Sequence, residues 1–123
     1  MPNWPGALFT QGIIELKAGN PDHALATLSQ CADITPDWAE VYFHLARAHF
    51  RTGDLGTAIQ IVGKSLALNP SWAEANYDLG NYHEKAGRFE EALAAFGKAA
   101  QIKPKWSEPG KRILSLKNSL GMN

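Results

Sequence analysis

A period of 34 residues runs through the chain and restricts its fold more than any other feature of the sequence. A fixed period between about 20 and 50 residues is typical of stacked supersecondary units, because one such unit cannot bury its apolar face alone. The spacing predicts three consecutive units over residues 5–38, 39–72 and 73–106. The residues that follow this period are Trp4, Trp38, Trp72 and Trp106, Pro2, Pro36, Pro70 and Pro104, and Gly19, Gly53 and Gly87.

Each unit has the pattern of two helices joined by a tight turn. In the second unit, Tyr42, Leu45 and His49 follow helical spacing, and no segment shows the alternation typical of a strand. The periodic glycines accept the left-handed backbone that ends a helix, and Asn20 and Asp54 behind them favour the start of a second helix. We expect helices at residues 5–18, 21–34, 39–52, 55–68, 73–86 and 89–102.

Signals for helix starts also mark the junctions between units. Asp37 and Ser71 each precede a glutamate by three residues, which is the spacing of a capping box. Beyond the third unit, residues 107–120 form an amphipathic pattern that Ser107 can cap. We expect this segment to be the capping helix that a terminal repeat requires, with its basic side chains, including Arg112, on a solvated polar face.

Small residues occupy two positions of every unit. Such residues let paired helices approach to about 8–10 Å, whereas bulky side chains there would separate them. The periodic tryptophans are expected to pack between consecutive units, where each ring would bury a large apolar area. The first and second helices of the units should therefore meet at Gly12, Ala46 and Gly80 and at Ala24, Ala58 and Ala92.

The third unit contains Ala73-Glu74-Ala75, Tyr77, Leu79-Gly80-Asn81, Gly87, Phe89, Glu91-Ala92, Phe96, Lys98-Ala99 and Pro104. In this order and spacing the residues resemble the tetratricopeptide repeat, a 34-residue pair of antiparallel helices. The resemblance extends through the other two units and covers 102 of the 123 residues. It implies an all-α fold, namely a right-handed α-solenoid of three antiparallel helix pairs plus a capping helix, in a single domain of residues 1–123.

Composition argues against several classes of function. Twelve basic side chains balance twelve acidic ones, so no overall basic field attracts nucleic acid, and we expect no nucleic-acid partner. No apolar run approaches the roughly 18 residues of a membrane span, so we expect no membrane insertion. The single cysteine permits no intramolecular disulfide, and the first residues lack the pattern of a secretory signal. These features together predict a cytoplasmic protein.

The sequence lacks the motifs of catalysis and cofactor binding. It contains no glycine-rich phosphate loop, no pair of metal-ligand cysteines and no nucleophile elbow. His49 and His83 share one column of the repeat, but two ligands cannot complete a zinc site. Cys31 falls in a column of small residues and is expected to be buried and unreactive. We predict no enzyme activity, no cofactor and no metal.

The resemblance implies a partner-binding site on the first helices, one stripe of which lines a concave groove in this family. Phe9, Phe43 and Tyr77 place an aromatic side chain at one position of every unit, which exceeds what packing requires. Partial burial of these rings against neighbouring helices is the alternative reading of the stripe. We predict that a protein or peptide ligand binds in a groove lined by Phe9, Ile13, Leu16, Phe43, Arg47, Phe50, Tyr77, Asn81 and Glu84.

Some members of the family hold the acidic C-terminus of a peptide through Lys and Asn side chains on the first helices. At the corresponding positions this chain carries Phe9, Ile13, His44, Glu74 and Asp78. Apolar and acidic side chains cannot bind a pair of carboxylates. This mode of recognition is therefore not expected here, and apolar anchors near Phe9 and Ile13 are favoured instead.

Two other functions stay open. Residues 1–46 carry five acidic and one basic side chain, whereas residues 98–123 carry six basic and one acidic. Opposite charges favour contact between copies, so a structural module that forms homo-oligomers through the groove or the terminal helices is the main alternative. The third possibility is a targeting appendage of an enzyme. Pro2-Asn3-Trp4 matches the last residues of a repeat, which favours an origin as part of a longer array.

Overall fold

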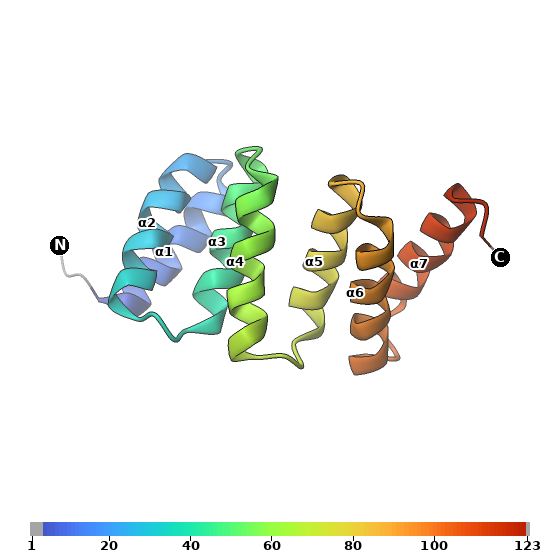
Figure 1. The fold of residues 1–123 in the computed structure, drawn as a ribbon. Coiled ribbons are helices and arrows are strands. Elements are labelled where there is room, and N and C mark those ends of the chain that lie inside the picture. The colour runs from blue at the N-terminus through green and yellow to red at the C-terminus, as the bar shows by residue number, and fades with distance from the viewer. Residues whose placement is uncertain (1–3, 123) are drawn as a thin grey trace. The chain divides into compact units, whose positions relative to one another are not determined.

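The structure is a computed structural model that describes residues 4–122, and these residues form seven helices and no strand. Pro2 and Asn3, which we interpreted as the end of a repeat, lie outside the described residues. The observed ends agree with the expected ones to within one residue, which confirms the all-α prediction (Figure 1). The helices are α1 (Pro5–Lys17), α2 (Pro21–Ile34), α3 (Ala39–Arg51), α4 (Leu55–Leu68), α5 (Ala73–Lys85), α6 (Phe89–Ile102) and α7 (Ser107–Ser119).

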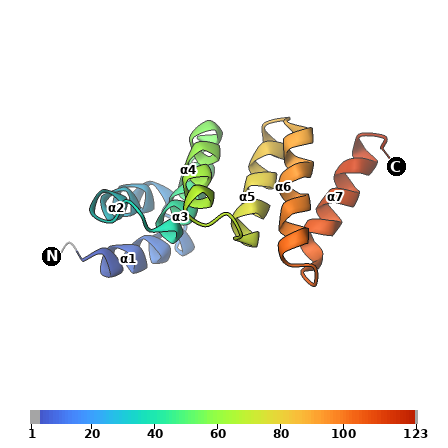
Figure 2. The ribbon, with the colours of Figure 1, turned by 60° about the horizontal axis from the view of Figure 1, so that its bottom comes forward.

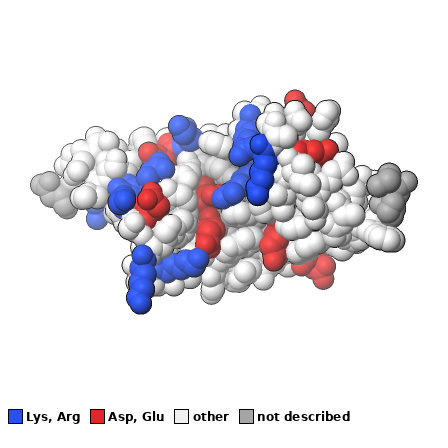
Figure 3. Space-filling view, turned by 180° about the vertical axis from the view of Figure 1, so that it is seen from behind, with Lys and Arg blue, Asp and Glu red and all other residues white. Residues whose placement is uncertain are grey.

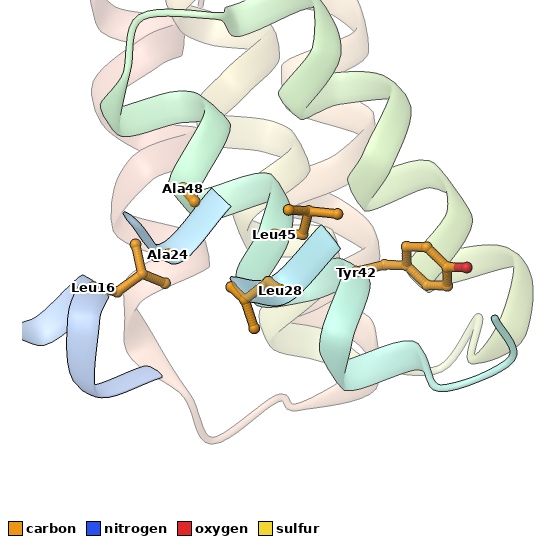
Figure 4. Packing of buried hydrophobic residues seen from close by; sticks show 6 residues of the cluster. All are labelled: Leu16, Ala24, Leu28, Tyr42, Leu45 and Ala48. Atoms are coloured by element: carbon orange, nitrogen blue, oxygen red, sulfur yellow. The ribbon is translucent and has the colours of Figure 1, made fainter. Parts of the chain in front are cut away.

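The chain divides into two compact units, Met1–Pro70 and Ser71–Asn123. In unit 1, α1 pairs with α2 and α3 pairs with α4, while α2 also packs against α3 (Figures 1 and 2). Because α2 contacts both α1 and α3, its apolar side chains join the two pairs into one core. That core contains Leu16 from α1, Ala24 and Leu28 from α2, and Tyr42, Leu45 and Ala48 from α3 (Figure 4).

Unit 2 consists of the pair α5 and α6, with α7 packed against α6. Leu116 of α7 joins Ala92 and Phe96 of α6 in a buried cluster, against which Tyr77 and Ile113 also pack. This apolar contact is the one we expected of a capping helix. The helix therefore covers apolar surface of α6 that would otherwise meet water.

The turns after the first helices share one geometry. Gly19 has a φ of +82°, its N–H donates to the carbonyl of Leu16, and the N–H of Asn20 donates to the carbonyl of Glu15. This pattern of hydrogen bonds is a Schellman motif, in which glycine adopts the left-handed conformation without a Cβ penalty. Gly121 repeats the motif at the end of α7 with a φ of +73°. The helix α7 thus ends in the same way as the first helix of a repeat.

The expected capping boxes were wrong. The helices after the unit junctions begin one residue later than a capping box requires, so Trp38 rather than Asp37 is the N-cap of α3, and its side chain makes no capping bond. The Trp38 ring instead packs 4.5 Å from the ring of Phe9. The same shift applies to α5, whereas α7 begins one residue earlier than expected, so that Ser107 is a helical residue and Trp106 is the N-cap. Packing of the indole, rather than capping by a side chain, fixes this helix entry.

The caps of the second helices follow the prediction more closely. Asp54 is the N-cap of α4, and its carboxylate accepts a hydrogen bond of 3.3 Å from the N–H of Thr57. This bond satisfies one of the N–H groups that a helix start leaves without a partner. Asn20 occupies the same position before α2, but its side chain makes no such bond. The expected cap is therefore confirmed at one of these two helix starts.

Paired helices meet where the small residues were expected. A Cβ atom added to Gly12 would lie 2.5 Å from the Cγ of Leu28, and one added to Gly80 would lie 2.6 Å from the ring of Phe96. Both distances are far shorter than van der Waals contact, so any larger residue requires the two helices or the opposing side chain to move. Each of these pairs combines a large side chain on the second helix with the smallest residue on the first.

This contact predicts opposite effects of one substitution at two helical glycines of unit 2. Gly97→Ala, which meets nothing within 4 Å, should gain on the order of 0.5–1 kcal/mol of stability from helix propensity. Gly80→Ala should lose on the order of 1–3 kcal/mol through overpacking against Phe96. Urea unfolding of both variants measures the difference, and a stabilised Gly80→Ala variant would contradict the packing described here.

Candidate functional site

Two of the predicted site residues of unit 1 lie half-buried on α1. The ring of Phe9 packs against Trp38 and stands 5.5 Å from the ring of His44, in an edge-on contact. Ile13 lies one helical turn further along, on the same stripe of α1. The alternative reading of partial burial thus applies to Phe9, because α3 covers part of its ring. The stripe nevertheless leaves both side chains partly accessible.

Two predicted site residues of unit 1 are buried, and this corrects their expected exposure. Leu16 is only 5% exposed, because Ala24 and Leu28 of α2 cover it in the core. Phe43 is also 5% exposed, and the guanidinium of Arg47 lies 4.3 Å from the centre of its ring. A partner can reach neither side chain directly without a rearrangement. Arg47 and Phe50 remain half-buried on α3, so the unit 1 surface consists of Phe9, Ile13, Arg47 and Phe50.

Basic side chains of α1 and α3 lie near the unit 1 surface. Arg51 donates a hydrogen bond to the carbonyl of Leu16, at the end of α1 where helix carbonyls are left without a helical partner. Burial, followed by the positive charges of Arg47 and Lys17, lowers the pKa of His44 from its usual 6.5 to about 4. His44 is therefore neutral at physiological pH. The surface thus combines apolar side chains with the fixed charge of Arg47, and the neutral imidazole of His44 lies beside Phe9.

The lowered pKa of His44 predicts a pH-dependent stability. Between pH 6.5 and 4 the unfolded chain binds a proton at this residue and the folded chain does not, so stability falls as the pH falls through this window. Between pH 7 and pH 5 the wild type should lose on the order of 1–2 kcal/mol more than His44→Gln does. His23→Gln, at an exposed position of α2, should behave as the wild type. Equal losses in the wild type and His44→Gln during urea unfolding would refute the assignment.

The three predicted site residues of unit 2 converge on one side chain of α7. Nη1 of Arg112 donates a 2.6 Å hydrogen bond to Oδ1 of Asn81, and Nη2 lies 2.6 Å from Oε1 of Glu84. The ring of Tyr77 packs 4.9 Å from Trp106 and 5.5 Å from Phe96. Burial disfavours the charged guanidinium, but the bonds to Glu84 and Tyr77 prevail and raise the pKa of Arg112. Arg112 thus carries its charge at every physiological pH.

Sequence reasoning missed this role of Arg112, which we expected on a solvated face. The signal was available in the repeat, because Arg112 stands 34 residues after Asp78 and 68 after His44. In unit 1, His44 of α3 faces Phe9 of α1, and in unit 2 Arg112 takes the corresponding position on α7 and faces α5. α7 follows the same pattern because it ends and packs as a first helix does.

Several basic side chains near the C-terminus are paired with carboxylates. Lys103 lies 2.6 Å from Glu74 and Lys111 lies 3.7 Å from Glu108. On the face shown in Figure 3, Lys and Arg side chains also lie beside Asp and Glu side chains in several groups. The excess of basic residues in this segment is therefore partly compensated by acidic neighbours.

Within residues 4–122, no three His, Cys, Asp or Glu side chains gather as metal ligands would. Cys31 is fully buried as expected, its thiol donates to the carbonyl of Pro5, and burial raises its pKa, so little thiolate forms at neutral pH. Ser65 makes the equivalent bond to Ala39.

None of the helices in the described part has the length and apolar character needed to traverse a bilayer.

Antiparallel helix pairs that recur every 34 residues define a helical-repeat protein. Two family models, both described as tetratricopeptide repeat, match residues 15–75 and 73–106. The chain belongs to the tetratricopeptide repeat family, whose fold serves as a protein-interaction module in general. No curated protein sequence matches the chain significantly.

Solved structures share this fold over nearly the whole chain. A crystal structure of MamA is 27% identical, with a TM-score of 0.94 over 98% of this chain and 71% of MamA. The first tetratricopeptide repeat domain of Spaghetti (RPAP3), solved with the HSP90 peptide SRMEEVD, is 21% identical, with a TM-score of 0.91 over 95% of this chain and 93% of that domain. The first such domain of human RPAP3 is also 21% identical, with a TM-score of 0.91 over 98% and 95% of the two chains.

Proposed function

We propose that this chain is a non-catalytic interaction module that binds a peptide or a helix of a partner protein on its first helices. The observation that carries the proposal is the unit 1 surface, where Phe9, Ile13 and Phe50 keep apolar area partly accessible beside Arg47. Accessible apolar groups beside an arginine are typical of the residues that dominate binding energy at interfaces. The peptide bound to the RPAP3 domain supports this class of partner, since the two chains share a fold.

The chemistry of the unit 1 surface favours an apolar anchor in the partner. Phe9 and Ile13 offer hydrocarbon, and the neutral His44 adds no charge. Burial of apolar area on binding contributes about 25 cal/mol per Å², which rewards a leucine-sized or aromatic side chain. Arg47 supplies a fixed positive charge near His44, whose ring contacts Phe9. An apolar side chain followed by an acidic one is therefore the preferred local pattern.

Truncation of the unit 1 surface tests this function. We expect Ile13→Ala combined with Phe50→Ala to weaken the binding of peptides selected from a random library against the whole chain by at least tenfold, about 1.4 kcal/mol. Because both side chains are only half-buried, stability should fall by less than about 2 kcal/mol. Calorimetric titration of purified peptides into folded wild type and variant gives the two affinities.

The matched control removes the same kind of apolar surface from the second helices of unit 1. Ile34 and Leu68 are 42% and 45% exposed, and Ile34→Ala with Leu68→Ala should leave peptide affinity unchanged. Peptides that bind the surface variant as tightly as the wild type would exclude the unit 1 surface. Equal losses in both double variants would show a general effect of stability rather than a binding site.

Self-assembly is a second candidate function, favoured by the exposed apolar residues of the terminal helices. Ile14 of α1 is 59% exposed and Leu114 of α7 is 63% exposed. These helices belong to chain segments of opposite charge, residues 1–46 and 98–123, and opposite charges favour association of copies. We infer a head-to-tail contact, in which α7 of one copy binds α1 of the next. Such a heterologous contact extends from copy to copy.

Sedimentation velocity over a range of concentrations tests self-assembly. The wild type should sediment faster as its concentration rises. Leu114→Glu should lower the association constant at least tenfold. Ile34→Glu, which adds the same charge at an exposed site on α2, should associate as the wild type does. A sedimentation coefficient that stays constant up to about 1 mM would eliminate this function, because a dissociation constant of that size corresponds to only about 4.1 kcal/mol of association free energy.

A further inference from the structure

We propose that Asn81, Glu84 and the rings of Tyr77 and Phe96 form a binding site for an arginine side chain of a partner protein, and that Arg112 occupies this site from within the chain. The inference rests on the proposed function for the class of partner. It adds the chemical group that unit 2 recognises, and it identifies Arg112 as a side chain that competes with the partner for the same site.

The geometry of the site fits a guanidinium group. The two nitrogens Nη1 and Nη2 of Arg112 each reach one acceptor, Asn81 Oδ1 and Glu84 Oε1, at 2.6 Å. The acceptors stand three residues apart on α5, so they lie on one face of the helix. The guanidinium carbon lies 5.3 Å from the centre of the Phe96 ring. A lysine has a single ammonium group and cannot reproduce this forked contact over a ring.

Helix packing does not require this polar site. In unit 1 the corresponding contact between first helices is made by Phe9 against Trp38 and His44, which is an aromatic contact without an ion pair. A partly buried ion pair adds little stability compared with apolar packing, because both groups must first lose water. The structure thus places a costly arrangement of charge where an apolar one suffices, and we attribute this arrangement to the recognition of a partner.

The site is open to a competing side chain. Arg112 and Glu84 keep 34% and 29% of their side-chain surface exposed. An arginine of a partner must displace Arg112 and therefore binds more weakly than it would to an empty site. Because Arg112 is tethered to α7, it competes at a high effective concentration. Because of this competition, only a partner that makes further contacts with the protein can bind with measurable affinity.

The test empties the site and measures arginine binding directly. In Arg112→Met the apolar stem remains against Phe96 while the guanidinium is lost. Titration with N-acetyl-L-arginine methylamide, followed by NMR, should show at least tenfold tighter binding to Arg112→Met than to the wild type. The amide signals of Tyr77, Asn81 and Glu84 should shift most. Two control ligands, the neutral analogue N-acetyl-L-citrulline methylamide and the corresponding lysine derivative, should bind Arg112→Met at least tenfold more weakly than the arginine derivative does.

Three further variants control this experiment. Lys111→Met removes a neighbouring cation that pairs with an exposed carboxylate, and it should bind the arginine derivative as weakly as the wild type. Arg112→Met combined with Glu84→Gln should lose the gain in affinity. If Arg112→Met does not fold, Arg112→Lys retains the charge without the fork and should still bind the derivative more tightly than the wild type.

Two results would overturn the arginine site. One is a folded Arg112→Met or Arg112→Lys variant that binds the arginine derivative no more tightly than the wild type. The other is equal binding of the arginine and citrulline derivatives. Ile13→Ala with Phe50→Ala should leave the binding of the derivative unchanged, so failure of the unit 1 surface and failure of this site are separate outcomes.

Discussion

The contact between a glycine on the first helix and a large side chain on the second determines how the pairs α1/α2 and α5/α6 are built. Leu28 fills the space that Gly12 leaves, and Phe96 fills the space at Gly80. Since each contact fixes the face that a first helix turns toward its partner, it also fixes which stripe remains for other contacts. The half-buried positions of Phe9 and Ile13 follow from this constraint in unit 1.

The repeat period made the fold predictable, because each unit supplies an independent reading of the same helix pair. Three occurrences of one glycine fixed the ends of the first helices to within one residue. The entries of those helices were less predictable. A capping box competes with packing of the adjacent indole, and at Trp38 the contact with Phe9 prevails over a cap by Asp37. Local sequence does not contain that distant contact.

The candidate site was predictable as a set of columns, but not in its accessibility. Periodicity assigned Leu16 to the accessible stripe of α1. In the structure, the Leu16 side chain instead packs against Leu28 in the core. Phe43 is likewise buried, although its column is partly accessible at Phe9. Arg112 was assigned to solvent because amphipathicity distinguishes polar from apolar faces and does not show which polar group finds a partner. Leu16 and Arg112 are decided by contacts between helices that lie apart in the sequence, with Leu28 of α2 in the first case and with Asn81 and Glu84 of α5 in the second.

The central claim is that the first helices carry the partner-binding surface, and mapping of amide chemical shifts tests it most directly. A peptide selected against the whole chain is titrated into isotopically labelled wild-type protein under native conditions. We expect the largest shifts on α1 and α3, at Ile13, Arg47 and Phe50, with little change at Ser29 and Lys64 of the second helices. Shifts concentrated on α2 and α4 instead would contradict a binding surface on the first helices.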